Sequence, residues 1–152
     1  MTLANSIISN YQIVRRDRKH GAPDDDTESR GRVCFYVRNN INFSPRLDLS
    51  IDQLENLCIE IRNPNSKPFL VMTWYRPPNS TIDKLHLFEN LIGRLDSENV
   101  EYYLLGDVNC NMGASVFDHE TKVLSSIADL YSLHQLIQEP TRITESSSTM
   151  MI

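Results

Sequence analysis

The stretch that decides the fold is residues 100–111, with the sequence VEYYLLGDVNCN. Its first half is a short apolar run rich in aromatic and aliphatic side chains, which favours a buried strand that Gly106 cuts short. Asp107 and Asn109 follow two residues apart, and in an extended chain this spacing points both side chains to the same side. A carboxylate beside an amide can orient a water molecule, a divalent cation or a phosphate oxygen. The alternative is that both residues merely turn the chain after the strand.

Apolar runs upstream of this stretch predict further strands at residues 11–14, 33–37, 57–61 and 69–74. A short polar turn joins the last two, so we expect an antiparallel hairpin, which excludes a purely parallel sheet. The run at 33–37 is apolar on both faces, and we expect it to be covered on both sides. Apolar positions at helical spacing predict two helices, at residues 82–95 and 120–133. The chain is therefore expected to be one α/β domain, with helices against a mixed, largely antiparallel sheet.

The negative net charge argues against non-specific binding of nucleic acid over the whole surface. The chain has 152 residues and a net charge of −5, so any affinity for DNA should be weak and lost with salt. One basic cluster stands out, which is either a solvated loop or a set of phosphate contacts: Arg15, Arg16, Arg18 and Lys19.

The three cysteines, Cys34, Cys58 and Cys110, fit no zinc spacing and leave an odd thiol if two of them pair. We therefore expect a reducing compartment, the cytoplasm or the nucleus, with free cysteines in strands behaving as small buried apolar side chains. No apolar run approaches the length of a membrane span, so no membrane partner is expected.

Four segments occur in one order along the chain: GRVCFYV at residues 31–37, WYRPPN at 74–79, GDVN at 106–109, and PTRIT at 140–144 leading into STMMI at 148–152. This arrangement resembles the endonuclease domain of non-LTR retrotransposons. Those domains belong to the endonuclease/exonuclease/phosphatase superfamily, alongside the AP endonucleases. The resemblance covers nearly the whole chain.

The resemblance implies a DNase-I-like fold, a four-layer α/β/β/α sandwich of mixed, largely antiparallel sheets. It also implies phosphodiester cleavage with a divalent metal, usually Mg²⁺, near Asp107 and Asn109. Asp107 would orient or deprotonate the attacking water, Asn109 would hold the phosphate or that water, and Tyr75 would place its hydroxyl on the scissile phosphate. DNA contacts are expected from Arg76, near the site, and from the basic cluster of Arg15, Arg16, Arg18 and Lys19.

Part of the implied catalytic set has no counterpart in this sequence. The metal-binding Glu of the resemblance would stand just before Met1, and its Asp-His pair would follow Ile152. We therefore expect a domain that is incomplete at both ends and inactive by itself. The leading hypothesis is a fragment of an endonuclease for retrotransposon target-site nicking, joined to a reverse transcriptase in the parent reading frame. The alternatives are a phosphatase or phosphodiesterase of the same superfamily, and a non-catalytic remnant or interaction module.

Overall fold

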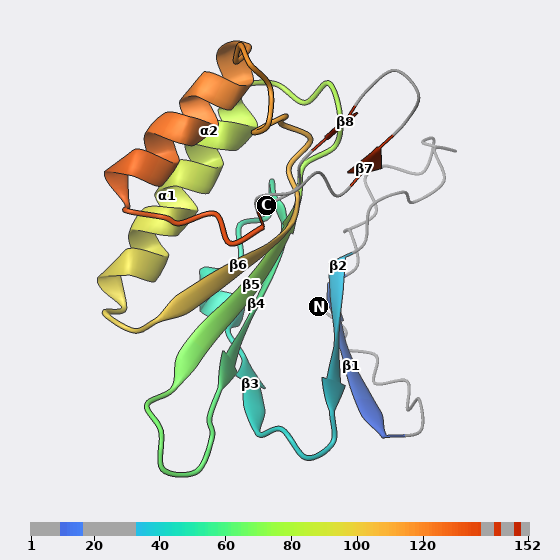
Figure 1. Ribbon diagram of the computed structural model, residues 1–152. Helices are drawn as coiled ribbons and strands as arrows, with labels where there is room; N and C mark the ends of the chain where they lie inside the picture. Colours follow the sequence, from blue (N-terminus) through green and yellow to red (C-terminus); the bar gives the residue numbers. More distant parts are fainter. Residues whose placement is uncertain (1–9, 17–32, 138–141, 144–147, 150–152) are drawn as a thin grey trace.

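A four-stranded sheet with the order β3-β4-β5-β6 forms the centre of the molecule (Figure 1). It is seen in a computed structural model that describes residues 10–16, 33–137, 142–143 and 148–149. The strands are β3 (Phe43–Pro45), β4 (Glu55–Ile61), β5 (Phe69–Tyr75) and β6 (Tyr102–Asp107). The pairs β3–β4 and β4–β5 are antiparallel, which confirms the predicted hairpin, whereas β5 and β6 are parallel. The sheet is therefore mixed.

A second, two-stranded sheet packs over β4 and β5. It consists of β1 (Tyr11–Arg16) and β2 (Val33–Arg38), which are antiparallel. The layer between the sheets is a small apolar core of Val14, Val33, Val37, Leu57, Ile59 and Ile61. The outer face of β2 is different from what its sequence predicts, because Tyr36 is 56% exposed and Cys34 is also exposed. Among the described residues, only the inner face of this strand is covered.

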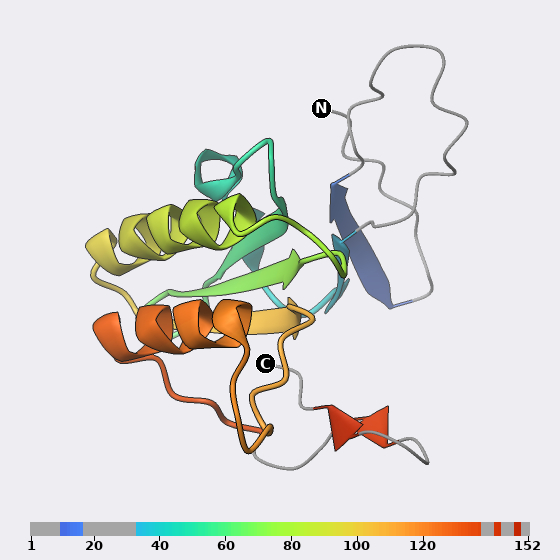
Figure 2. The same ribbon diagram turned by 90° about the horizontal axis from the view of Figure 1, so that it is seen from above.

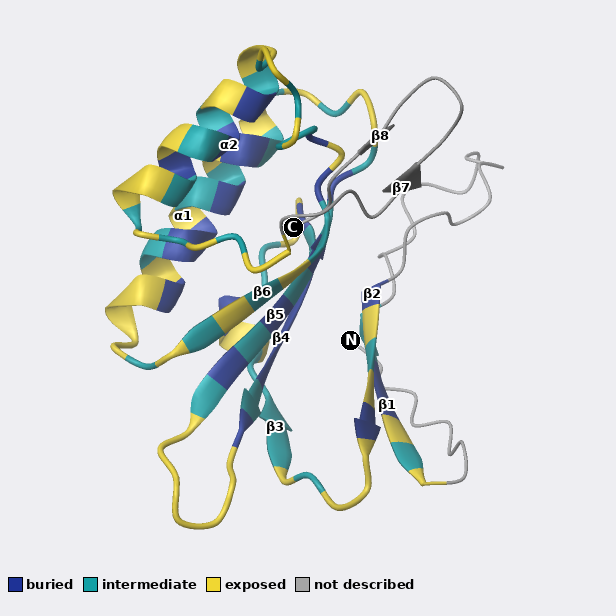
Figure 3. Cartoon of the chain, in the orientation of Figure 1, coloured by how far each residue is buried: buried dark blue, intermediate teal, exposed yellow. Residues whose placement is uncertain are grey.

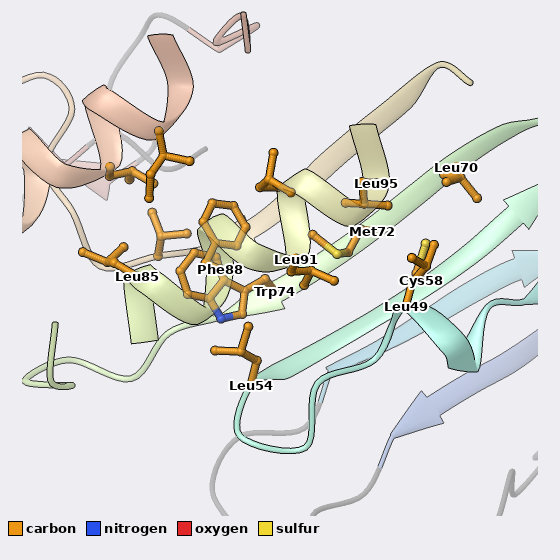
Figure 4. Packing of buried hydrophobic residues seen from close by; sticks show 14 of the residues in the cluster. Leu49, Leu54, Cys58, Leu70, Met72, Trp74, Leu85, Phe88, Leu91 and Leu95 are labelled. Carbon is orange, nitrogen blue, oxygen red and sulfur yellow. The ribbon is translucent and has the colours of Figure 1, made fainter. Parts of the chain in front are cut away.

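Two helices, α1 (Asp83–Ser97) and α2 (His119–Leu130), cover the other face of the four-stranded sheet (Figure 2). Alternate residues of β5 point to them, and Trp74 stacks on Phe88 with ring centroids 3.9 Å apart. Figure 4 shows this packing at close range. The helix-side core continues along the sheet through Leu70, Met72, Leu85, Leu91, Ile92, Leu95, Leu124 and Ile127.

Some boundaries differ from the predicted ones for local physical reasons. Strand β6 continues through Gly106 to Asp107, so this glycine does not cut the strand short. Its φ is +146°, and a Cβ there would lie 1.9 Å from the carbonyl oxygen of Trp74, so only glycine fits. Helix α2 ends at Leu130, before the left-handed Ser132 with φ 53°. The short β3 and the 3₁₀ turn η1 (Leu47–Leu49) carry no strong pattern and were not predicted.

The carboxyl-terminal part contributes a small antiparallel hairpin of β7 (Arg142–Ile143) and β8 (Ser148–Thr149). No helix in the described part of the chain is long and apolar enough to cross a membrane. The architecture is thus a mixed α/β fold in which helices, a four-stranded sheet and a two-stranded sheet lie in successive layers.

Candidate functional site

Three chemically active side chains share one row across the end of the four-stranded sheet. In the pairing of β4 with β5, Glu55 is the partner of Tyr75, and in the pairing of β5 with β6, Tyr75 is the partner of Asp107. Residues paired across neighbouring strands point to the same face, here the face toward the β1–β2 sheet. Because neighbouring strands lie about 4.8 Å apart, the backbone of Tyr75 lies beside those of Glu55 and Asp107. The structure therefore brings the predicted Tyr75 and Asp107 together.

The third predicted residue, Asn109, lies in the turn that follows β6. The backbone N–H of Asn109 donates to Oδ1 of Asp107 at 3.0 Å, and the residue has a left-handed φ of 49°. Its side-chain Nδ2 donates to the backbone oxygen of Arg76 at 2.7 Å. Asp107 and Asn109 thus do turn the chain, as the simpler interpretation holds. The turn uses one carboxylate oxygen and the donor end of the amide, so an oxygen of each side chain is left to meet a ligand.

Arg76, which is expected to contact DNA, lies inside the protein. Its side chain is 1% exposed. The guanidinium Nη2 pairs with the carboxylate of Glu120 and donates to the backbone oxygen of Ser80 at 3.0 Å. Nη1 faces the turn and donates to the backbone oxygen of Val108 at 3.3 Å. In this geometry Arg76 supports the site from within, because it cannot reach a phosphate without giving up these bonds.

The basic cluster on β1 is also used inside the protein where it is described. Arg16 Nη1 donates to the backbone oxygen and to Oδ1 of Asn56, both at 3.1 Å. Its Nη2 pairs with Asp52 at 3.0 Å, and the Arg16 side chain is only 11% exposed. Arg16 therefore ties the two sheets together at the end where the site lies. Arg15 is half-buried beside it in β1, and Arg18 and Lys19 fall outside the described residues.

The side chains at the site can supply only a few of the ligands that a metal ion needs. Among the residues that the structure describes, no group of three or more His, Cys, Asp or Glu side chains could hold a metal ion. Asp107 and Asn109 offer one carboxylate and one amide oxygen. Magnesium commonly binds through one or two carboxylates and fills its shell with waters and substrate phosphates. These residues fit a magnesium ion held mostly by water and substrate, and they do not form a cage.

Two hollows lie on the surface, and only the smaller one is beside the site. A cavity of about 90 Å³ lies beside the row and is lined by residues that include Glu55, Tyr75 and Lys84. The larger hollow, of about 660 Å³, lies on the helix side of β6, between α2 and residues 131–137. The row of Glu55, Tyr75 and Asp107 lies across the end of the sheet, with Asn109 exposed in the next turn.

Two acidic residues at the site were missed from the sequence. Glu55 could have been found from the hairpin alone, since pairing Ile61 with Phe69 across the turn automatically pairs Glu55 with Tyr75. Glu120 carried no such signal, because its contact with Arg76 joins positions 44 residues apart.

Comparison with known proteins adds no family to this picture. A scan against protein-family models matched none of them, and a search of the curated proteins found no match. The structure by itself defines a mixed α/β protein with helices on one side of a sheet and a second sheet on the other.

Proposed function

We propose that this chain carries part of the active site of a metal-dependent endonuclease that hydrolyses DNA phosphodiester bonds, as in retrotransposon target-site nicking. The complete domain would be a four-layer α/β/β/α sandwich of the endonuclease/exonuclease/phosphatase superfamily. One observation carries the proposal: Tyr75 and Asp107 are register partners at the carboxyl ends of two adjacent parallel strands. Asn109 occupies the turn directly after them.

The chemistry of these residues suits attack on a phosphodiester. Such a reaction needs an oriented water, a proton acceptor and donors for the charge that develops on the phosphate. Asp107 orients the water and accepts its proton, the amide oxygen of Asn109 accepts a hydrogen bond from that water, and the Tyr75 hydroxyl donates to the phosphate. A bound Mg²⁺ would supply Lewis-acid stabilisation of the same charge, with Asp107 and Asn109 as its protein ligands.

The shape of the site favours a polymeric substrate. A cavity of about 90 Å³ beside Tyr75 is well below the volume of typical small-molecule sites, which is roughly 300–1,000 Å³. The face of β6 beyond the β1–β2 sheet is open, with Leu105 53% exposed and Tyr103 39% exposed (Figure 3). The small volume of this cavity supports DNA over the phosphatase alternative.

A second candidate function is a non-catalytic interaction module. It is favoured by the bonds within the turn, because Asp107 and Asn109 have a structural use that explains their presence without chemistry. The two candidates differ in whether the turn binds a divalent cation.

Metal binding by the turn separates these candidates. We expect Mn²⁺ titrated into the ¹⁵N-labelled chain to broaden the amide signals of residues 107–111 first, and Mg²⁺ to reverse the broadening. Asp107→Asn should abolish the effect. Asp96→Asn, which removes an exposed carboxylate from the far end of α1, is the matched control and should leave it unchanged. Broadening that is spread over the acidic surface and survives Asp107→Asn would refute the endonuclease proposal.

The same proposal predicts no cleavage by the 152-residue chain itself in a supercoiled-plasmid nicking assay with Mg²⁺. The reason is that losing one group that stabilises the transition state costs on the order of a hundredfold to a thousandfold in rate, and several act as a unit. Nicking by the purified chain that disappears in Asp107→Ala would overturn this expectation.

A further inference from the structure

The turn from Asp107 to Cys110 is anchored by its alternate residues. Val108 and Cys110 are 5% and 3% exposed, whereas Asn109 is exposed. The two buried residues fix the backbone, and the exposed residue presents its side chain at the site. The geometry of the site therefore depends on what holds Val108 and Cys110 in place.

Arg76 contacts each of the four residues of this turn. Its backbone N–H donates to the oxygen of Asp107 at 2.9 Å, and its backbone oxygen accepts from the side chain of Asn109 at 2.7 Å. Its side-chain Nη1 reaches the other two residues, the backbone oxygen of Val108 at 3.3 Å and the sulfur of Cys110 at 3.8 Å. The backbone contacts do not depend on the side chain at position 76, but the side-chain contacts require an arginine there.

The far side of the guanidinium is held by α2. Nη2 of Arg76 pairs with Glu120, the second residue of that helix, and donates to the backbone oxygen of Ser80 at 3.0 Å. A guanidinium that is 1% exposed is costly to bury unless an opposite charge is near, and Glu120 supplies that charge. Because the guanidinium is rigid and planar, the contacts that hold Nη2 also fix the direction in which Nη1 points.

We propose that the buried Arg76 and the partly exposed Glu120 form a positioning pair that holds the Asp107–Cys110 turn in its site geometry and couples this turn to the first turn of α2. Its role in catalysis rests on the proposed function, whereas its role in ordering the turn does not. The arginine of the WYRPPN segment is then a residue that acts through Asp107 and Asn109 and does not itself touch the phosphate.

The cysteines give a readout that is independent of activity. Cys34 is exposed, whereas Cys58 and Cys110 are 0% and 3% exposed. Burial raises the pKa of both hidden thiols, that of Cys58 to about 12, while the charge of Arg76 opposes the rise at Cys110. In the unchanged protein we expect iodoacetamide to modify Cys34 and to spare the other two, as followed by peptide mass spectrometry.

If Arg76 holds the turn closed, removing the guanidinium opens the turn. Opening exposes the Cys110 thiol, which is 3% exposed in the unchanged protein, to the alkylating reagent. The proposal predicts that Arg76→Met accelerates alkylation of Cys110 by roughly tenfold or more, with Cys58 still protected.

The matched control is Arg46, another arginine with several carboxylate partners. It pairs with Asp48, Glu60 and Glu98 and does not contact the turn. Arg46→Met should leave the alkylation of Cys110 unchanged. Arg76→Lys keeps the charge opposite Glu120 but loses the second branch of the fork, so it should give a rate between those of the wild type and Arg76→Met. Slower or unchanged modification of Cys110 in Arg76→Met would overturn the proposal.

The milder variant Glu120→Gln decides the case in which Arg76→Met disrupts the whole fold and exposes Cys58 as well. Glu120→Gln should accelerate Cys110 alone. If it exposes both buried cysteines or neither, the pair does not position this turn and the proposal fails.

The Mn²⁺ titration separates this inference from the proposed function. Arg76→Met should remove the broadening at Asn109, and Arg46→Met should retain it. A wild-type chain that shows the cysteine pattern but no broadening at the turn would refute the endonuclease and leave the positioning pair intact. Normal broadening in Arg76→Met would show that the pair does not position the site residues.

Discussion

The two faces of the four-stranded sheet are covered to very different extents. On the helix side, a continuous core runs from Leu70 through Trp74 to α1 and α2. On the other side, the β1–β2 sheet covers β4 and β5 through six buried residues, and β6 is left with Leu105 53% exposed. The candidate site lies on the half-covered face, where Tyr75 and Asp107 end their strands.

The two faces of this sheet therefore have different roles. The closed face supplies most of the buried apolar area and therefore most of the stability. On the half-covered face, the described residues leave β6 exposed. The two sheets are joined near the first residues of β4 by polar contacts of Arg16 with Asn56 and Asp52, and not by apolar packing alone.

The largest effect is expected on the closed face. Trp74→Ala removes the ring that stacks on Phe88 and should lower the free energy of unfolding by about 3–5 kcal/mol, because the helix-side core cannot collapse into so large a void. Leu105→Ala, on the open part of the other face, should change it by no more than about 0.5 kcal/mol. Urea denaturation measures both. Equal losses would show that the faces do not differ in this way.

A smaller effect is expected at the polar link between the sheets. Arg16→Met should cost about 2 kcal/mol, because it leaves the fully buried Asn56 short of a partner. The control Arg62→Met breaks an exposed pair with Glu60 and should cost about 1 kcal/mol or less.

The same Arg16 variant also tests its place in DNA binding. If the guanidinium belongs to the fold, Arg16→Met should leave the salt dependence of DNA binding in fluorescence anisotropy unchanged. A shallower salt slope would instead restore Arg16 as a phosphate contact.

The smallest effect concerns the start of α2, the helix that holds Glu120. The Asp118 carboxylate accepts from the backbone N–H of Thr121 at 2.7 Å, and this bond lowers the pKa of Asp118. Asp118→Ala should therefore cost about 1 kcal/mol at neutral pH.

The pH dependence of that effect follows from the sign of the pKa shift. Because the folded pKa lies below the unfolded one, the charge-dependent part of the stabilisation is fully present above the unfolded pKa. It is lost as the pH falls through the folded pKa. The wild type and Asp118→Ala should thus converge in acid, as measured by thermal unfolding. Asp129→Ala, at the other end of α2, should show no loss at neutral pH, and a pH-independent Asp118 effect would contradict the assignment.

Local patterns predicted most of the fold. The hairpin of β4 and β5 follows from alternating apolar residues and a short turn, and α1 follows from a helical stripe. The predicted element boundaries were wrong where the conformation of a residue depends on a neighbour far away in the sequence. Gly106 looks like a strand end in the sequence, but the strand passes through it because the carbonyl oxygen of Trp74 lies where a Cβ would be.

The candidate site was predicted from a local pattern as well. Tyr75, Asp107 and Asn109 each stand at or just past the end of an apolar run. The sequence did not show the role of the basic residues, because an arginine on the surface and an arginine buried against internal partners cannot be told apart in it. Arg76 and Arg16 were expected to face DNA, and in the structure both are held by internal partners that lie far away in the sequence.

The sequence by itself therefore determined the periodic elements, the antiparallel hairpin and the residues that end its strands, since these depend on neighbours a few positions apart. Only the tertiary structure decided that Glu55, Tyr75 and Asp107 form one row, that β6 stays half-covered, and that Arg76 reaches Glu120. The physical reason is that register across a crossover and the partner of a buried charge are set by packing over the whole chain. No short stretch of sequence contains the neighbours that determine them.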